Sequence, residues 1–522
     1  MEATKNKIQS RNVFSYGLTI PVIIAVFEIM VQTLFHGRYG YFRDELYYIA
    51  CTKHLDLGYV DHPPLSIFLL WINRHLLGDS LYAMRLLPSL AGASVIILAA
   101  LTARKLGGGR FCQSLAALSV AAAPGLAGMA QLFTMNPFDV FFWTLTGYIL
   151  VCLFVDNKPK LWIYFGLVIG LGLLNKYSIG FMVIGLITGM LFTHQRKHFA
   201  SLWFWSGAAI AALIFFPHVL WQISHSFPSL EFMRNASMNK NVHLGPIKLF
   251  LGQVQDINFF NTPLWLGGIY FFYKHNKSSL RPLAWIYPIV FLIMVFSNGK
   301  VYYLAASYPL YLAGGAVLFE QIIPSIHLKW AKPAFISSLM IYGLISVPFT
   351  MPVLPIEQFI KYQSLVGTAP RADERSGVAE LPQYFADQFG WKELVSKVAG
   401  AYRKLSKEEQ AQCLIYMRNY GQAGAIEFFG KDYGLPNVVC PHNSYWLWGP
   451  GNRTGNIAII IGPANSLNEN LADLHKYYKY VEFADITNAK YTMPFERGRM
   501  IFICKGMNTT FQKIWSNERF YI

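Results

Sequence analysis

The sequence predicts an α-helical, multi-pass membrane protein that carries a soluble α/β domain at its C-terminal end. Three observations support this fold class. Of the 522 residues, 54% are hydrophobic and only 14% are charged, and the mean hydropathy is +0.33, values that are atypical of soluble proteins. Long apolar segments recur up to about residue 350. Beyond residue 355 the apolar segments become short and charged residues become frequent.

Eleven apolar segments have the length of membrane-spanning helices, which need about 17 to 25 mostly apolar residues. So many spans in one chain predict a helical bundle embedded in the membrane. The predicted spans are residues 13–35, 80–103, 112–130, 137–155, 161–175, 178–194, 201–222, 250–273, 283–298, 302–320 and 333–350.

The basic residues predict the orientation of this bundle. The net charge is +16, but Lys and Arg form short clusters between apolar segments and no continuous basic face, so nucleic-acid binding is not expected. Every second loop is basic, and basic loops tend to remain in the cytoplasm. We therefore expect a cytoplasmic N-terminus and, after an odd number of spans, an outer C-terminal domain. The clusters contain Lys5, Lys7, Arg11, Arg104, Lys105, Arg110, Lys158, Lys160, Arg196, Lys197, Lys274, Lys277, Arg281, Lys329 and Lys332.

We expect two domains, a transmembrane domain of residues 1–354 and a soluble domain of residues 355–522. Prolines and a glycine near the junction indicate a linker. Short helical and strand-like patterns alternate in the second domain, which is typical of a small α/β unit. Its glycine-rich segment at 449–455 lacks the Gly-Lys-Ser/Thr ending of a phosphate-binding loop, so an ordinary loop is expected there. The predicted helices are 387–405, 421–430 and 466–475, and the predicted strands are 413–417, 437–440, 457–461 and 500–504.

The loop after the first span, residues 36–79, is too long for a simple turn. Helical periodicity with mixed polar faces occurs at 44–54 and again at 65–77. These patterns predict two helices that lie along the outer surface of the membrane.

Acidic and aromatic side chains concentrate in this loop. Asp44 and Tyr47 share a face of the first predicted surface helix, Glu45 follows Asp44, and the pair Asp61-His62 precedes the second. Ionisable groups at the mouth of an apolar bundle are costly and often functional. The alternative is that Asp44 only caps its helix while Glu45 is a favourable charge in the first turn.

Three further outer turns place polar groups at the same membrane level. They contain Asn136 and Asp139, then Lys176, then Lys300 and Tyr302. Asn136 and Asp139, taken alone, are better explained as helix caps. Lys176 and Lys300 are exceptions to the cytoplasmic distribution of basic residues. Isolated outer lysines can extend to the membrane surface for solvation, but two beside a carboxylate cluster suit an anionic phosphate.

Carboxylates, tyrosines and lysines on one face of a bundle fit the transfer of a sugar from a lipid phosphate. A carboxylate would accept the proton of the acceptor hydroxyl or amine, and lysines would stabilise the charge on the departing phosphate. The alternative is a polytopic transporter or lipid flippase with a soluble regulatory tail. Such proteins tend to place ionisable groups near the bilayer midplane. Here Glu28 and Asp256 are the only acidic residues well inside the predicted spans, and most ionisable residues cluster at one surface.

Across residues 13–350 the sequence resembles the bacterial membrane glycosyltransferases related to protein O-mannosyltransferases (glycosyltransferase family 39-like) and to the enzyme that adds aminoarabinose to lipid A. These enzymes share the GT-C fold. The resemblance rests on Arg43-Asp44-Glu45, Asp61-His62-Pro63-Pro64-Leu65, Arg85-Leu86-Leu87-Pro88, the turn from Asn136 to Trp143, and Lys300 to Pro309.

The resemblance implies an enzyme of a bacterial inner membrane that uses a polyprenyl-phosphate sugar donor and a lipid, glycan or protein acceptor of the cell envelope. It also implies an essential aspartate at the position of Asp44, and it leaves room for a divalent cation, since metal use varies in the family. Relatives often have Asp where this chain has Asn136, so we expect Asp139 to take the second carboxylate role. Relatives also often have a Glu-Lys pair where this chain has Asp61-His62, which exchanges a lysine for a titratable imidazole.

These arguments predict one site on the outer face. Its sugar, its exact acceptor and the task of the soluble domain stay open. The predicted catalytic residues are Asp44, Glu45, Asp61 and Asp139, and the predicted substrate-binding residues are Tyr47, His62, Arg85, Asn136, Lys176, Lys300 and Tyr302.

Overall fold

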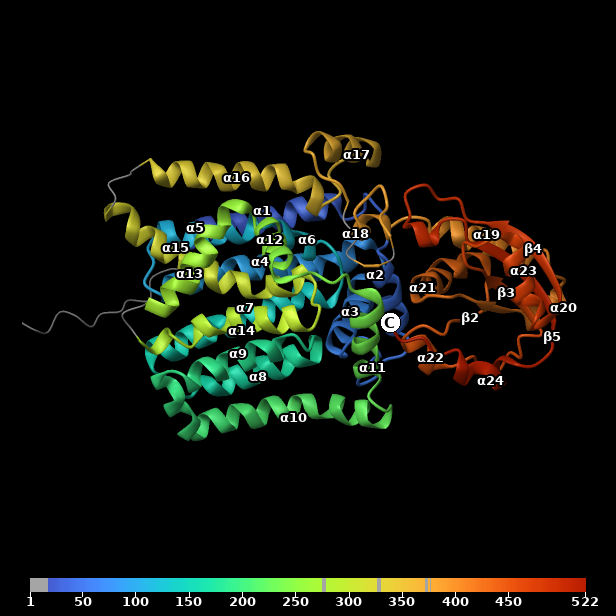
Figure 1. Ribbon diagram of the computed structural model, residues 1–522, viewed down its shortest axis with the longest axis horizontal. Helices are drawn as coiled ribbons and strands as arrows, with labels where there is room; N and C mark the ends of the chain where they lie inside the picture. The colour runs from blue at the N-terminus through green and yellow to red at the C-terminus, as the bar shows by residue number, and fades with distance from the viewer. Residues whose placement is uncertain (1–16, 275–277, 326–329, 371–373, 376) are drawn as a thin grey trace, which may run out of the picture.

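A computed structural model describes residues 17–274, 278–325, 330–370, 374–375 and 377–522. Helices that run side by side form a bundle, and the C-terminal region lies beyond one end of it (Figure 1). The basic residues Lys5, Lys7, Arg11, Lys277 and Lys329 of the topology prediction lie outside the described residues.

The predicted spans are helical, and the chain is a multi-pass membrane protein. In the part of the chain that the structure describes, six helical segments are long and apolar enough to cross a membrane. The main helices of the bundle are α1 (Thr19–Phe35), α4 (Leu81–Lys105), α7 (Met135–Asp156), α8 (Leu161–Asn175), α9 (Ile179–Leu191), α10 (Leu202–Ser224), α14 (Leu283–Phe296), α15 (Tyr308–Ser325) and α16 (Ala331–Thr350).

Two predicted continuous spans are broken helices, which corrects the sequence prediction. Span 112–130 consists of α5 (Arg110–Ala121) and α6 (Pro124–Met129), because Pro124 lacks an N–H and favours the first turn of a new helix. Span 250–273 is divided at Asn258, whose φ of 81° ends the helix. The Asn258 amide donates to the carbonyl of Ala122 at 3.0 Å, so one break helps to satisfy the other. This second span comprises α12 (Pro246–Asp256), η4 (Phe259–Asn261) and α13 (Thr262–Lys274).

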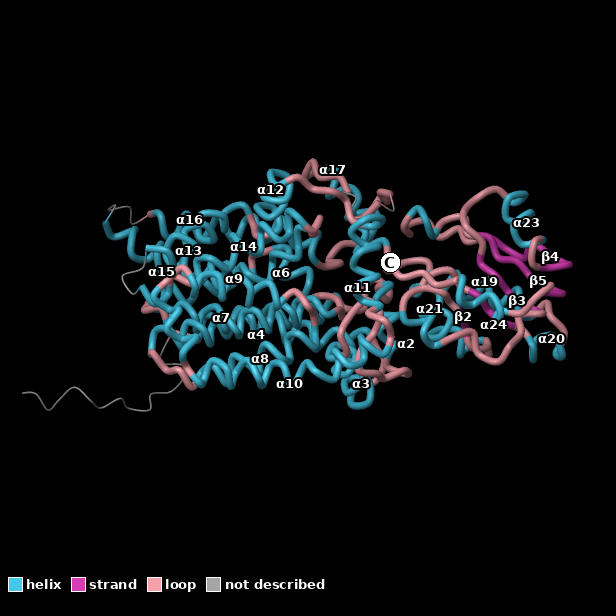
Figure 2. Tube along the Cα trace, turned by 60° about the horizontal axis from the view of Figure 1, so that its bottom comes forward, coloured by secondary structure: helices cyan, strands magenta, loops and turns pink. Residues whose placement is uncertain are grey.

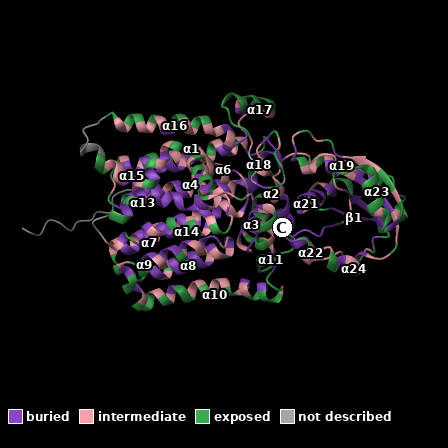
Figure 3. Ribbon diagram, viewed as in Figure 1, coloured by how far each residue is buried: buried purple, intermediate pink, exposed green. Residues whose placement is uncertain are grey.

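Burial separates the centre of the bundle from its flanks. Buried side chains are dense on α4, α7 and α15, whereas few residues of α10 and α16 are buried (Figure 3). Helices α8 and α10 touch through backbone, since a Cβ on Gly166 would lie 2.0 Å from the carbonyl oxygen of Gly207. Small residues allow such close contact between membrane helices. Any larger side chain at Gly166 would force α10 away.

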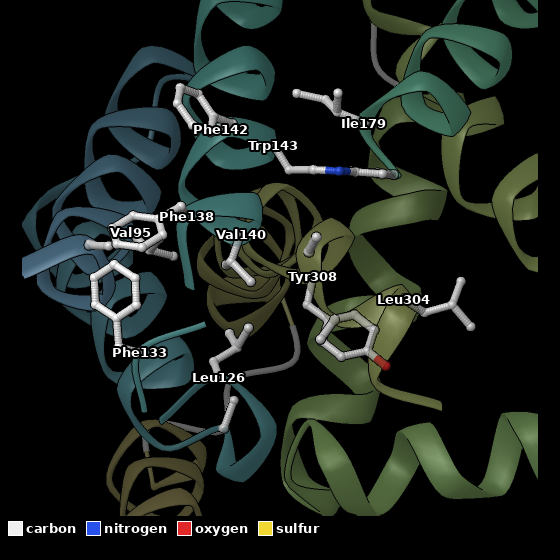
Figure 4. Close-up of a cluster of buried hydrophobic side chains, with 14 of the residues drawn as sticks. Val95, Leu126, Phe133, Phe138, Val140, Phe142, Trp143, Ile179, Leu304 and Tyr308 are labelled. Carbon is white, nitrogen blue, oxygen red and sulfur yellow. The ribbon is translucent and has the colours of Figure 1, made fainter. Parts of the chain in front are cut away.

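A buried apolar cluster surrounds the first turns of α7. Val95 of α4, Leu126 of α6, Ile179 of α9 and Tyr308 of α15 contribute to it, together with Trp143 of α7 itself (Figure 4). The cluster therefore holds the beginning of α7, and with it the polar residues of that first turn, in a fixed position.

Three short helices cross the end of the bundle beside the C-terminal region (Figure 1). They are α2 (Arg43–Cys51), α3 (Leu65–Leu77) and α11 (Pro228–Asn235), so both predicted surface helices are present. Pro64 stands at the N-cap of α3, where the fixed φ of proline prepares the first turn. The 3-10 segment η6 (Val301–Ser307) leads into α15 at this end.

The C-terminal region contains a five-stranded mixed sheet in the order β2-β1-β3-β5-β4 (Figure 2). Strand β1 pairs in parallel with β2 and β3, whereas β5 is antiparallel to β3 and β4. In the register of the centre, Ile459 lies opposite Ile503. The strands are β1 (Leu414–Tyr416), β2 (Val438–Val439), β3 (Ile457–Ile461), β4 (Tyr478–Ile486) and β5 (Met500–Met507).

Strand β4 was not predicted from the sequence. It is an edge strand with exposed polar positions, so it lacks the continuous apolar run that marks a buried strand. The predicted helix 387–405 begins at Trp391 instead, because Gly390 has a φ of 85° and separates it from the short helix before it. Segment 449–455 is a loop, as expected. The helices are α17 (Ile356–Leu365), α18 (Gln383–Ala386), α19 (Trp391–Arg403), α20 (Lys407–Gln412), α21 (Tyr420–Phe429), α22 (Ser444–Trp448), α23 (Leu467–His475) and α24 (Phe511–Ile514).

Candidate active site

Helix α2 presents its two neighbouring acids to different surroundings. The N-cap of α2 is Phe42, and its N–H donates to Oε2 of Glu45 at 2.9 Å. Glu45 therefore closes the first turn of the helix. Asp44 is not the N-cap, so the alternative that its carboxylate only caps the helix is removed.

Glu45 forms a wholly buried ion pair with Arg85 of α4. Its Oε1 accepts from Nε of Arg85 at 2.8 Å and from the N–H of Phe133 at 3.0 Å, and its Oε2 accepts from Nη2 of Arg85 at 2.7 Å. Arg85 also donates to the carbonyls of His36 and Gly40. Both side chains have 0% exposure. The structure thus places these two predicted site residues inside the protein, where they join α2 to α4.

Asp44 is the acid of this pair that reaches the surface. Its side chain is 31% exposed, and its Oδ1 accepts a hydrogen bond from the hydroxyl of Tyr420 at 2.9 Å. Nε of the neighbouring Arg43 lies 3.7 Å from the same oxygen. Tyr420 belongs to α21 of the C-terminal region, so residues far apart in the chain meet at this carboxylate.

The second predicted acidic pair, Asp61-His62, also lies against α2. Oδ1 of Asp61 accepts from the hydroxyl of Tyr47 at 2.9 Å, and burial raises the pKa of the Asp61 carboxyl, although the neighbouring His62 and the Tyr47 hydrogen bond oppose the shift. The His62 ring lies 4.7 Å from the Tyr48 ring and is fully buried. Its Nδ1 contacts the carbonyl of Pro63, and its Nε2 has no hydrogen-bond partner among the described residues.

A second group of predicted residues meets where α7 begins and α8 ends. Thr134 caps α7 by accepting from the N–H of Asn136, so neither Asn136 nor Asp139 caps this helix with its side chain. Nζ of Lys176 donates to Oδ1 of Asn136 at 2.8 Å and lies 3.4 Å from Oδ2 of Asp139. Oδ1 of Asp139 accepts from the hydroxyl of Ser178 at 2.6 Å. Asp139 therefore holds Lys176 in place.

Lys176 connects this group to the turn before α15. Its ammonium lies 4.9 Å from the ring centre of Tyr303 and 5.6 Å from that of Tyr302, within the range of cation–π attraction. Tyr302 is also close enough to Asp44 for a Coulombic interaction. The residues around Asp44 (the α2 group) and the residues around Lys176 (the α7 group) thus lie at the same end of the bundle, beside the C-terminal region (Figure 1).

Lys300 is paired differently from Lys176. Its Nζ lies 2.8 Å from Oε1 of Glu374, and Nζ of Lys240 lies 3.7 Å from the same oxygen. Burial opposes ionisation, but Lys240, Arg43 and Lys300 together hold the pKa of the Glu374 carboxyl well below its usual range. Glu374 is therefore a carboxylate that neutralises two lysines near the site.

Among the described residues, no three His, Cys, Asp or Glu side chains are grouped so that they could hold a metal ion. The chain's own donors therefore do not form a ready-made cation site in the part of the chain that the structure describes.

Three residues of the site were not found by sequence analysis. Ser178 follows the Asn175-Lys176-Tyr177 turn. Its position two residues after Lys176 in the sequence could have indicated that it belongs to the site. Tyr420 and Ser444 gave no such signal, since each is more than 370 positions away from the residue that it contacts. Ser444 donates its backbone N–H to the Tyr47 hydroxyl at 3.3 Å.

Comparison by sequence finds a known family that part of the bundle resembles. The model of the dolichyl-phosphate-mannose-protein mannosyltransferase family matches residues 61–221, which include Asp61, Asp139 and Lys176. Lipid A galacturonosyltransferase RgtD of Rhizobium johnstonii is 24% identical over 324 residues, which cover 60% of this chain and 66% of RgtD. The chain thus spans just under two thirds of the length of that relative.

Comparison by structure extends over nearly the whole chain. ArnT from Cupriavidus metallidurans bound to undecaprenyl phosphate superposes with a TM-score of 0.57 at 14% identity, over 93% of this chain and 97% of ArnT. The apo state of ArnT gives a TM-score of 0.55 at 12% identity over the same shares. At these identities the likeness is one of fold. The predicted fold is confirmed, since the chain as a whole shares the GT-C fold of ArnT, and residues 61–221 match the model of the dolichyl-phosphate-mannose-protein mannosyltransferase family.

Proposed function

We propose that the protein transfers a sugar from a polyprenyl-phosphate donor to a lipid A-type acceptor on the outer side of the membrane. The donor class is supported by the fold shared with ArnT, which was solved with undecaprenyl phosphate bound. The acceptor class is supported by the relative RgtD, a lipid A galacturonosyltransferase. A transporter or flippase is not supported, because these relatives are transferases.

The exposure of Asp44 is the observation that carries this proposal. Its side chain is 31% exposed, whereas those of Glu45 and Asp139 are 0% and 4% exposed and fully engaged with partners. A general base has to reach the proton that it removes. Of these three carboxylates, Asp44 alone is open enough to do so.

Asp44 would accept the proton of the acceptor. The acceptor oxygen attacks the anomeric carbon while its proton passes to the Asp44 carboxylate. The bond between the anomeric carbon and the phosphate oxygen breaks, and its electron pair leaves with the polyprenyl phosphate. One bond forms opposite to the bond that breaks, so the configuration at the anomeric carbon inverts.

Lys176 would stabilise the phosphate as it departs. An ammonium aimed at a developing negative charge lowers the barrier most when it is already in position. Asn136 and Asp139 provide that position through the contacts at 2.8 and 3.4 Å. Lys300 would assist once the phosphate replaces Glu374 as its partner. Tyr302 would line the site between Lys176 and Asp44.

Buried groups would position this machinery. Glu45 and Arg85 would hold α2 against α4 through their paired contacts and would not touch the substrate. Asp61 and His62, together with Tyr47, would shape the floor beside Asp44. These assignments replace the catalytic role predicted for Glu45 and the substrate-binding role predicted for Arg85.

The proposed location is a bacterial inner membrane with the site on the periplasmic or extracellular side. The basic loop residues Lys105 and Lys158 lie beside Asp156 at the end of α7, whereas the C-terminal region lies at the opposite end of the bundle (Figure 1). Because basic loops stay in the cytoplasm, residues 355–522 would lie outside. We propose residues 1–354 as the transmembrane domain.

Purified protein in detergent tests the function directly. Lipid A is incubated with polyprenyl-phosphate galacturonic acid, and separately with polyprenyl-phosphate aminoarabinose, and the products are identified by mass spectrometry. We expect one donor to be consumed and lipid A to gain the mass of one sugar. Failure to consume either donor would reject the proposed donor class. Consumption with water but not lipid A as acceptor would reject the proposed acceptor.

A further inference from the structure

The C-terminal region contacts the helix that carries Asp44, and at Gly424 no side chain separates the two backbones. Gly424 of α21 faces α2 so closely that a Cβ there would lie 2.8 Å from the carbonyl carbon and oxygen of Leu46. A Cβ on Gly421 would lie 2.5 Å from Cγ of Arg43. Two glycines one turn apart therefore form a flat surface on α21 into which α2 fits.

Three hydrogen bonds join the C-terminal region to Asp44 and to the residues that surround Asp61. The Tyr420 hydroxyl donates to Oδ1 of Asp44 at 2.9 Å. The N–H of Ser444 donates to the hydroxyl of Tyr47 at 3.3 Å. The N–H of Val60 donates to Oγ of Ser444 at 3.1 Å, directly before Asp61 in the chain. The C-terminal region thus acts on both acidic pairs of the first outer loop.

We propose that the C-terminal domain completes the active site and that Tyr420 is the positioning residue that orients Asp44. This inference rests on the proposed function, in which Asp44 accepts the proton. An aspartate turns freely about its last bond unless a partner selects one orientation. By binding Oδ1, Tyr420 leaves Oδ2 as the oxygen available to the acceptor.

Tyr420 is itself held firmly enough for this role. It is buried, its ring centre lies 4.8 Å from that of Tyr47 and 4.7 Å from that of His442, and the guanidinium of Arg43 lies 5.3 Å from the ring centre. Burial raises the pKa of the Tyr420 phenol well above its usual value, although Arg43 opposes the shift. The hydroxyl therefore remains a neutral donor at working pH.

The charged and titratable surroundings of Asp44 come from several elements. Arg43 is the basic neighbour on its own helix, and the aromatic hydroxyls and remaining acids act from the other elements. The groups that face Asp44 are Arg43, Tyr48, Asp61, Tyr302, Asp387 and Tyr420.

Removal of one hydroxyl tests the positioning role. Tyr420→Phe keeps the ring, so the packing against Tyr47 and His442 is preserved. Tyr416→Phe is the matched control, since its hydroxyl also donates to a carboxylate, that of Glu518 at 2.7 Å, but away from the site. We expect Tyr420→Phe to lower kcat by about 10-fold or more, the usual effect of a lost hydrogen bond to a charged group, with little change in KM for the donor.

The pH profile separates positioning from a structural effect. Because the charged form of Asp44 loses a donor, we expect the acidic limb of kcat/KM to move to higher pH in Tyr420→Phe and not in Tyr416→Phe. Tyr420→His retains a ring with an N–H donor, and we expect it to be more active than Tyr420→Phe.

Three results would overturn the inference: an unchanged kcat in Tyr420→Phe, an equal loss in both Tyr→Phe variants, or a His variant no more active than the Phe variant. Failure of the proposed function is distinguishable, because the unmodified protein would then show no sugar transfer at all.

Discussion

Asp44 and Glu45 are adjacent acids on one short helix, yet they occupy two different regions of the molecule. Glu45 turns into the bundle, where Arg85 and two backbone N–H groups surround it at 0% exposure. Asp44 turns toward the C-terminal region and is 31% exposed, with one hydrogen bond from Tyr420. A buried, fully paired carboxylate stabilises structure, whereas a partly open one can exchange a proton with a ligand.

The largest expected effect comes from neutralising the open acid. We expect Asp44→Asn to lower sugar transfer by about 10²- to 10⁴-fold, the range for loss of a general base, with the thermal midpoint unchanged. Asp56→Asn, an exposed acid in the same loop, is the control and should retain activity. Transfer is measured with labelled donor in detergent. Normal turnover by Asp44→Asn would remove it from the mechanism.

Replacing the buried acid, Glu45, should lower the stability of the protein. Glu45→Gln leaves the Arg85 guanidinium buried without its counter-charge, so we expect a loss of about 3–5 kcal/mol in unfolding free energy. The double variant Glu45→Gln/Arg85→Met should recover part of this loss. Asp156→Asn is the control, because its pairs with Lys105 and Lys158 are partly exposed and cost little when broken. A stable, inactive Glu45→Gln would contradict the division of roles between the two acids.

A change in the α7 group, at Lys176, should have a smaller effect on the rate. Lys176→Met removes the charge that Asn136 and Asp139 hold in place, and we expect kcat/KM for the lipid-phosphate donor to fall about 10²-fold. Lys160→Met is the matched control, since Lys160 also lies over an aromatic ring, that of Trp203, but at the other end of the bundle. Equal activity of the two variants would argue against a phosphate role for Lys176.

The last effect concerns the pH dependence of stability. Burial raises the pKa of Asp387 from its usual 3.8 to about 7, although Arg43 opposes the shift. Between these values the folded protein holds a proton that the unfolded chain has released, so this group's contribution to stability falls as pH rises through the window and is lost above about 7.

Asp387→Asn should remove that dependence. The thermal midpoint of the variant, relative to the unmodified protein, should therefore rise between pH 4 and 7 and level off above 7. Asp473→Asn changes an acid whose side chain is 70% exposed and should show no such rise. Parallel midpoints for Asp387→Asn and the unmodified protein would mean that Asp387 stays ionised.

Much of the bundle was predictable because membrane spans are long and apolar. Regular periodicity also predicted α2 and α3, as well as four of the five strands. The helix breaks at Pro124 and Asn258 were missed because hydropathy averaged over a long segment does not depend on the backbone conformation of a single residue. Strand β4 was missed because an edge strand keeps polar residues exposed.

The sequence by itself determined the fold class and pointed to the residues that meet at the end of the bundle beside the C-terminal region. Composition and motif spacing are local properties, and they were sufficient to select Asp44, Asp61, Asp139 and Lys176 as candidates. Only the tertiary structure decided which acid is open and which is paired. Arg85 lies 40 positions from Glu45, and Tyr420 lies 376 positions from Asp44. Burial and hydrogen bonding across such separations depend on how helices pack, and no pattern along α2 records that packing.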